Sequence, residues 1–182
     1  MRIGFSGAQS VGKTTLLNAL RSEPIFKHYT ICNEVTRRVK SYGLPINEDG
    51  NNITQKLIMQ EHIVNVFMHK HMITDRTVLD GLVYSQYLHQ RGNINDQTFL
   101  FCKDVFNQVI NQYDLLFYIH PEFEVVDDGI RSVDKEFRNN IVQLFKQNIE
   151  ENLVPVIMVH GSVRERVEQV LRFVKEKHEF SR

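Results

Sequence analysis

The sequence predicts a single α/β domain built on a five-stranded parallel sheet with helices on both faces. Two observations predict it. Five short apolar runs alternate with longer segments of helical periodicity along the 182 residues, a rhythm typical of parallel strands joined by crossover helices. A glycine-rich run also follows the first apolar run directly and leads into a helical segment. Ligands of such folds bind at the carboxyl ends of the strands.

Local residue patterns predict where each strand and helix begins and ends. Turn residues bound the apolar runs, and apolar residues at helical spacing mark the helices. The expected strands are 2–6, 29–32, 72–74, 114–119 and 154–159. The expected helices are 15–20, 53–71, 78–91, 96–112, 132–151 and 162–177, with a short helical or irregular piece at 35–39. Dense turn signals predict a mobile loop at 41–52, and the polar segment 121–138 is expected to act as a lid.

The composition excludes some classes of function. The chain carries 22 basic and 22 acidic residues, so no broad nucleic-acid-binding face is indicated. The first forty residues are nonetheless basic, which suits a polyphosphate and could also seat a nucleic-acid end. No apolar run reaches membrane-spanning length, and Cys32 and Cys102 fit no metal or redox spacing. A cytoplasmic location without a membrane partner is expected (host cytoplasm for a phage-encoded chain), and the oligomeric state is left open.

The glycine-rich run fits the phosphate-binding pattern Gly, four residues, Gly-Lys-Ser/Thr. Glycine permits backbone angles that a Cβ would resist, so the N–H groups of the loop can converge on an anion at a helix N-terminus. Lys13 is expected to reach the β- and γ-phosphates, Thr14 to bind Mg²⁺, and Thr15 to face the α-phosphate. The expected ATP-binding residues are Gly7, Ala8, Gln9, Ser10, Val11, Gly12, Lys13, Thr14 and Thr15. The pattern therefore predicts a P-loop NTPase.

Two strand ends carry an acid followed by a basic residue. Glu34, after the second strand, could orient or deprotonate an acceptor hydroxyl, and Arg37 could bind a substrate phosphate or ribose. Asp75, after the third strand, could hold Mg²⁺ or act as the base, with Arg76 near the transferred group. The ordinary interpretations are a solvated charged turn for the first pair and a helix cap for Asp75.

A third charged cluster runs from Asp127 to Arg138. Arg131 and Arg138 in a polar flap could neutralise charge on a transferred phosphoryl group. A flap can also exclude water, which prevents wasteful hydrolysis. The ordinary interpretation is a surface loop with helix ion pairs.

Together these motifs resemble the NadR-type P-loop kinase group. The residues that carry the resemblance are the phosphate loop, Glu34-x-x-Arg37, Asp75-Arg76 and Asp128-Gly129-x-Arg131 with Phe137-Arg138. The group includes the nicotinamide riboside kinase domain of NadR and related AAA-labelled phage and bacterial proteins. The resemblance implies a nucleoside- or nucleotide-kinase-like fold, Mg-ATP as phosphoryl donor and a lid carrying arginines. Deoxynucleoside kinases are more distantly similar.

The leading hypothesis is an ATP-dependent kinase that phosphorylates a hydroxyl of a small nucleoside, nucleotide or modified base. The expected catalytic residues are Lys13, Glu34, Asp75 and Arg131, the substrate-binding residues are Glu34, Arg37, Arg76 and Arg138, and the metal-binding residues are Thr14 and Asp75. A narrower alternative is a kinase acting on hydroxymethylated pyrimidine in DNA, which would require base flipping in a duplex. Another is an ATPase that drives a protein partner. A GTPase is disfavoured because the Asn-Lys-x-Asp and Asp-x-x-Gly motifs are missing.

Overall fold

A computed structural model describes residues 1–33, 35–121 and 135–180 of the chain. Its centre is a five-stranded sheet in the order β2-β3-β1-β4-β5, and every neighbouring pair is parallel. The strands are β1 (Arg2–Ser6), β2 (Thr30–Cys32), β3 (Met72–Asp75), β4 (Leu115–Ile119) and β5 (Ile157–Val159). The predicted parallel sheet is therefore confirmed. Because β1 lies between β3 and β4, the phosphate loop that follows it leaves from the middle of the sheet.

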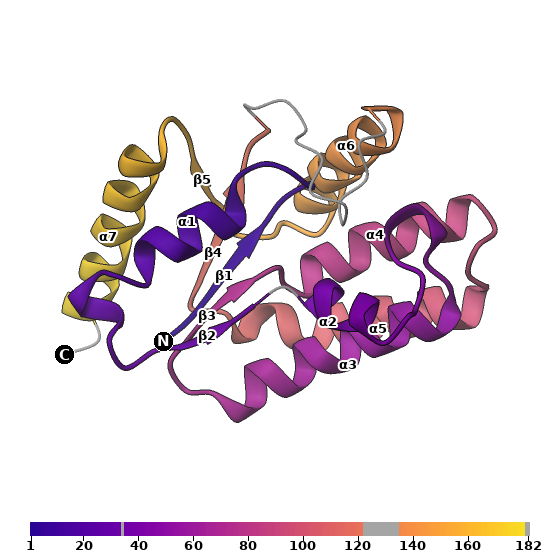
Figure 1. Cartoon of the computed structure of the whole chain (residues 1–182), viewed down its shortest axis with the longest axis horizontal. Coiled ribbons are helices and arrows are strands. Elements are labelled where there is room, and N and C mark those ends of the chain that lie inside the picture. Colours follow the sequence, from indigo (N-terminus) through magenta and orange to yellow (C-terminus); the bar gives the residue numbers. More distant parts are fainter. Residues whose placement is uncertain (34, 122–134, 181–182) are drawn as a thin grey trace.

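Helices cover both faces of this sheet, as Figure 1 shows. On one face α1 (Lys13–Leu20) packs against α7 (Val163–Phe180). On the other face α4 (Val78–Gln90) packs against α5 (Asp96–Val109) and α6 (Lys135–Glu151), while α3 (Asn52–Met68) packs against α5 and α2 (Val35–Ser41). The predicted α/β layering is thus confirmed. Among the described residues, no helix has the length and apolar character needed to cross a bilayer.

The core lies between the sheet and these helices. The central strands read as continuous apolar runs because they are buried on both faces. Phe5 of β1 and Phe117 of β4 are fully buried, and their rings stack with centroids 5.2 Å apart. A second, smaller apolar cluster joins Val35 and Val39 of α2 to Ile46 and to Ile58 of α3. The phosphate loop is thus anchored on the large core, whereas α2 rests on the small one.

Several boundaries differ from the expected ones by up to three residues. The last strand begins at Ile157 rather than at residue 154, because Pro155 has no N–H to donate to a neighbouring strand. The helix expected over 53–71 ends at Met68. The helix expected over 96–112 becomes a 3-10 turn, η3 (Ile110–Gln112), before the next strand. Two further 3-10 turns, η1 (Pro24–Phe26) and η2 (Asn47–Asp49), lie in connections. Mobility of 41–52 stays a prediction.

Candidate active site

The loop between β1 and α1 has the backbone of an anion site. Gly7, Ser10 and Gly12 have positive φ angles of 147°, 57° and 88°. A Cβ on Gly7 would lie 2.7 Å from the carbonyl oxygen of Ile119, so the close approach of β4 requires glycine there. Gly12 is the N-cap of α1 and offers no side-chain acceptor to the first helical N–H groups. An anion bound there would lie at a helix N-terminus, where backbone N–H groups favour negative charge.

Lys13 lies across this loop. Its side chain is only 5% exposed, and its Nζ donates to the carbonyl oxygens of Gly7 at 2.7 Å and Ala8 at 2.6 Å. The ammonium group is thereby held beside the backbone of the glycine-rich loop. Thr15, on the first turn of α1, is exposed at the mouth of the loop. The predicted phosphate-binding residues therefore form one continuous feature.

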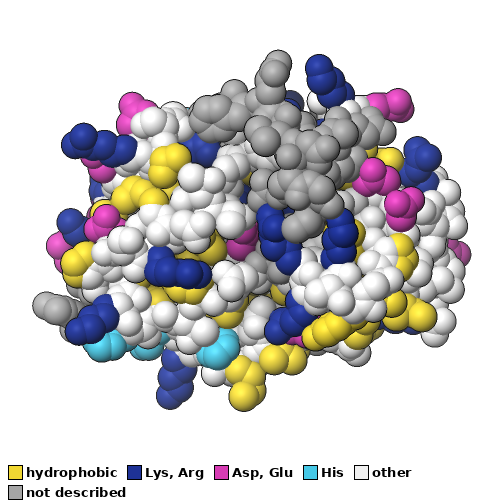
Figure 2. Space-filling model, viewed as in Figure 1, with side chains coloured by type: hydrophobic (Ala, Val, Ile, Leu, Met, Phe, Trp, Pro, Cys, Tyr) yellow, Lys and Arg dark blue, Asp and Glu magenta, His cyan; other side chains and the backbone are white. Residues whose placement is uncertain are grey.

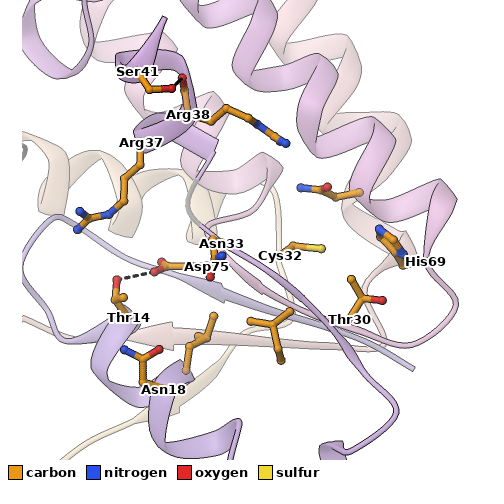
Figure 3. Close-up of a pocket in the computed structure, with 13 residues that line it drawn as sticks. Thr14, Asn18, Thr30, Cys32, Asn33, Arg37, Arg38, Ser41, His69 and Asp75 are labelled. Atoms are coloured by element: carbon orange, nitrogen blue, oxygen red, sulfur yellow. Dashed lines mark hydrogen bonds between the residues drawn. The ribbon is translucent and has the colours of Figure 1, made fainter.

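Thr14 and Asp75 meet at the edge of the loop. Thr14 Oγ1 donates to Asp75 Oδ2 at 2.6 Å, as Figure 3 shows. Asp75 is in register with Phe5, which places its carboxylate beside the start of the loop. A hydroxyl and a carboxylate are oxygen ligands that suit Mg²⁺, which keeps several waters and takes the rest of its ligands from phosphates. The pair therefore offers the kind of oxygen ligands that a nucleotide-borne Mg²⁺ takes.

A cleft of about 630 Å³ opens directly beside this pair. Thr14 and Asp75 form part of its wall, together with residues from α1, β2, α2 and α3. Because β2 is an edge strand, the cleft runs past the open side of the sheet rather than into the core. Its volume lies in the range of small-molecule sites. Figure 2 shows Lys and Arg side chains gathered near the middle of one face of the molecule.

Two consecutive arginines of α2, Arg37 and Arg38, line this cleft but point in different directions. Arg38 pairs with Glu61 of α3, so its charge is partly neutralised. In Figure 3 the Arg37 side chain extends to the side of the view where Thr14 lies, whereas Arg38 extends to the opposite side. Arg37 is thus the predicted substrate-binding residue that the structure brings into the cleft with Thr14 and Asp75.

Residues of α4 support the loop from behind. Asp80 Oδ1 accepts from the N–H of Gly7 at 3.4 Å, and its Oδ2 accepts from the N–H of Thr77 at 3.0 Å. The hydroxyl of Tyr84 donates to Gln9 Oε1 at 3.0 Å. The Thr77-x-x-Asp80 capping box is the sequence signal that assigns Asp80 to the helix start. Tyr84, one turn later on the same helix face, was not predicted.

Arg76 does not line the cleft. It has a positive φ of 80°, a strained conformation for a residue with a Cβ. Its Nη1 lies 3.4 Å from Asp80 Oδ1, and its guanidinium lies 4.9 Å from the ring centroid of Tyr84. It therefore faces a small recess between α3 and α4 that also contains His62. The structure places this predicted substrate-binding residue behind the loop.

Two groups near the site have shifted pKa values. Burial lowers the pKa of His62 to about 3, with the positive charge of Arg76 acting in the same direction, so the imidazole is neutral near pH 7. Burial raises the pKa of the Cys32 thiol in the cleft, which Arg38 partly opposes. Cys32 is therefore a protonated thiol at neutral pH rather than a nucleophile.

Some predicted residues cannot be placed. Glu34 and Arg131 lie outside the described residues, as does the stretch from Asp127 to Gly129. Arg138 lies in the first turn of α6 and is half-buried, outside the residues that line the cleft. The lid and its arginines therefore stay predictions.

Several solved structures share this fold, and some of them are named as kinases. The chain is similar to deoxyadenosine kinase from M. mycoides, at 16% identity and a TM-score of 0.65, over 97% of this chain and 99% of that chain. NadR in complex with NR aligns at 19% identity and a TM-score of 0.72, over 97% of this chain and 51% of that chain. Thymidylate kinase from Candida albicans aligns at 12% identity and a TM-score of 0.65, over 97% and 92%. No curated protein matches the chain by sequence.

Fold and site together define a P-loop nucleotide-binding α/β domain. Residues 2–166 match the family described as AAA domain, so the chain belongs to that family. The predicted resemblance to NadR-type P-loop proteins is confirmed at the level of the fold. At these identities the neighbours establish the fold alone.

Proposed function

We propose that this protein is an ATP-dependent kinase that transfers a γ-phosphoryl group to a hydroxyl of a nucleoside or nucleotide. One observation carries the proposal. Thr14 and Asp75, at the mouth of the phosphate loop, also form a wall of the 630 Å³ cleft. A donor held by the loop and an acceptor held in the cleft would therefore meet at this wall. Relatives of this fold that bind nucleosides or nucleotides by name support the acceptor class.

The donor side rests on the loop. Its N–H groups and the Lys13 ammonium bind the β- and γ-phosphates. Thr14 and Asp75 would hold Mg²⁺, which neutralises the charge that develops on the β- and γ-oxygens. Asp75 accepts a hydrogen bond from the Thr14 hydroxyl, so in this proposal its carboxylate takes part in the metal site. This favours Glu34 over Asp75 as the base.

The acceptor side rests on Arg37 and Glu34. The acceptor hydroxyl attacks the γ-phosphorus, a new P–O bond forms, the bond to the β–γ bridging oxygen breaks and ADP leaves. The hydroxyl proton passes to the Glu34 carboxylate. Arg37 positions the acceptor from the cleft wall. Arg76 supports the site from behind through Asp80, and Arg131 and Arg138 would close over the transferred group.

The open side of the cleft gives the DNA alternative a specific basis. Because the cleft runs past edge strand β2, an acceptor base could enter it while the rest of a polymer stayed outside. Arg37 and Arg38 would then face the phosphodiester backbone. Binding of that kind weakens steeply as salt rises, which separates it from a free nucleoside acceptor.

An acceptor screen tests the proposal. The protein is incubated with labelled ATP, Mg²⁺ and panels of nucleosides, mononucleotides and hydroxymethyl-modified DNA, and label transfer is measured. Transfer to one small-molecule panel supports the proposal, and transfer only to DNA supports the alternative. A different result would overturn both: no acceptor gains label, and a protein partner stimulates ATP hydrolysis. That result would favour an ATPase module.

Two isosteric variants assign the carboxylates. Glu34→Gln is expected to lose transfer by about 10²- to 10⁴-fold with ATP affinity unchanged, because only the base is removed. Asp75→Asn is expected to shift the Mg²⁺ dependence to higher concentrations, because a metal ligand loses its charge. If Glu34→Gln turns over normally and Asp75→Asn does not respond to added Mg²⁺, the two roles are reversed.

A further inference from the structure

Arg166 reaches the phosphate loop from the far end of the chain. It lies on the first turn of α7 and is 1% exposed, the largest of the fully buried side chains described. Its Nη1 donates to the carbonyl oxygen of Val11 at 2.7 Å, across 155 positions of sequence. α7 packs against α1 along the same face of the sheet, so the contact is held by helix packing and not by a flexible tail.

This bond fixes one peptide group of the loop. The described peptide bonds are all trans, so the Val11 carbonyl and the Gly12 N–H point in opposite directions from the same plane. A carbonyl held outward by Arg166 therefore turns the Gly12 N–H inward, toward the other loop donors. Within the described residues that N–H donates to no protein acceptor. Gly12 also needs to be glycine here, since its φ is 88° and a Cβ would lie 3.3 Å from Arg166 Nη1.

Two positively charged side chains, Arg166 and Lys13, lie buried beside the loop. A charged group removed from water is unfavourable unless hydrogen bonds and opposite charge offset the loss. Arg166 and Lys13 place two buried cations on the same loop, Arg166 behind the Val11 peptide and Lys13 across Gly7 and Ala8. A polyphosphate bound at the loop would place negative charge close to both cations.

We propose that Arg166 is a positioning residue for nucleotide phosphates. It acts through the Val11 carbonyl to aim the Gly12 N–H and adds positive charge behind the loop. The proposal rests on the nucleotide-binding half of the proposed function and is independent of the acceptor. It assigns to α7 a part in phosphate binding that the sequence motif does not contain.

The test compares Arg166→Met with Arg164→Met. Both variants remove one positive charge from the same turn of α7, but the Arg164 side chain is 89% exposed and pairs with Glu168 in solvent. Affinities for Mg-ATP and for inorganic tripolyphosphate are measured by calorimetry. Arg166→Met is expected to weaken both by about 10- to 100-fold, because a hydrogen bond from a charged group and one aimed amide are lost. Arg164→Met is expected to change them less than about threefold.

A third variant separates positioning from folding. Arg166→Lys keeps the charge and a donor group, so its affinity is expected to lie between those of wild type and Arg166→Met. If Arg166→Met fails to fold, an affinity of Arg166→Lys below that of wild type still supports the proposal. The amide proton of Gly12, followed by NMR, should shift downfield on adding Mg-ATP in the wild type and less in Arg166→Lys. Wild-type affinity in both folded Arg166 variants would overturn the proposal. A wild type that binds neither ligand would overturn the nucleotide site itself, whereas binding without phosphoryl transfer would leave this proposal standing.

Discussion

The two sides of the candidate site are built differently. The donor side consists of buried groups on the large core: Lys13 is 5% exposed, Asp75 2% and Asp80 1%. The acceptor side is an open cleft at an edge strand, and residues of α2 line it. α2 itself packs on the small apolar cluster of Val35, Val39, Ile46 and Ile58. A rigid donor site and a lightly anchored acceptor site suit an enzyme that binds one common nucleotide and adapts the second pocket to its substrate.

The largest expected effect falls on the donor side. Lys13→Ala should lower phosphoryl transfer by about 10²- to 10³-fold or more, because a cation aimed at the transferring phosphates is removed. Saturating Mg-ATP, at 100 times its Kd, should stabilise the wild type by about 2.7 kcal/mol. That corresponds to a rise in Tm of about 5–10 °C for a chain of this size, and the rise should shrink or vanish in Lys13→Ala.

The exposed Lys27 provides the control for charge. Lys27→Ala should keep both the transfer rate and the nucleotide-dependent rise in Tm. An unaltered Tm shift in Lys13→Ala would contradict a donor site on this loop, and the contrast between the two sides of the site would then have no basis.

A smaller effect is expected from the recess behind the loop. His62 is 1% exposed, and among the described residues neither ring nitrogen has a hydrogen-bond partner. Its folded-state pKa of about 3 lies below the ordinary histidine value of 6.5, so between these values the unfolded chain binds more protons than the folded one. Stability is therefore lost as pH falls below about 6.5, by about 2 kcal/mol from this group at pH 5.

Chemical denaturation at pH 7.5 and pH 5 measures this effect. His62→Leu, a neutral apolar replacement, should be less stable than wild type at pH 7.5 or equal to it, but should lose about 2 kcal/mol less on going to pH 5. His28→Leu, which removes an exposed imidazole, is the matched control. Equal pH dependence in wild type and His62→Leu would show that the buried imidazole does not couple stability to pH.

The sequence predicts the features that depend on local patterns and misses those that depend on contacts between distant segments. Apolar runs set the five strands, and the fixed spacing of Gly7, Gly12, Lys13 and Thr14 set the nucleotide loop, because both are local patterns. Side-chain contacts between segments far apart in the sequence leave no such local pattern. The contact of Arg166 with Val11 and that of Tyr84 with Gln9 depend on how α7 and α4 pack.

Arg76 shows the same limit within a predicted motif. Its place after Asp75 predicts a residue near the transferred phosphoryl group. In the structure its guanidinium lies beside Asp80, at a positive φ of 80°. Backbone strain of this kind is produced by the surrounding fold and leaves no signal in a single sequence. The sequence likewise does not predict the cleft, because the cleft depends on β2 being an edge strand and a single sequence does not give the strand order.

The smallest expected effect separates the two arginines of the acceptor side. Arg37→Met should raise the KM of the acceptor by about 10-fold with the Kd of ATP unchanged, since one charge-assisted contact to the acceptor is lost. Arg38→Met removes the neighbouring charge, but that arginine is half exposed and pairs with Glu61, so a change of about threefold or less is expected. Initial rates at varied acceptor concentration, with ATP affinity measured separately, distinguish the two. If Arg38→Met has the larger effect on the acceptor KM, the acceptor lies toward α3, and the wall formed by Thr14 and Asp75 is not where the two substrates meet.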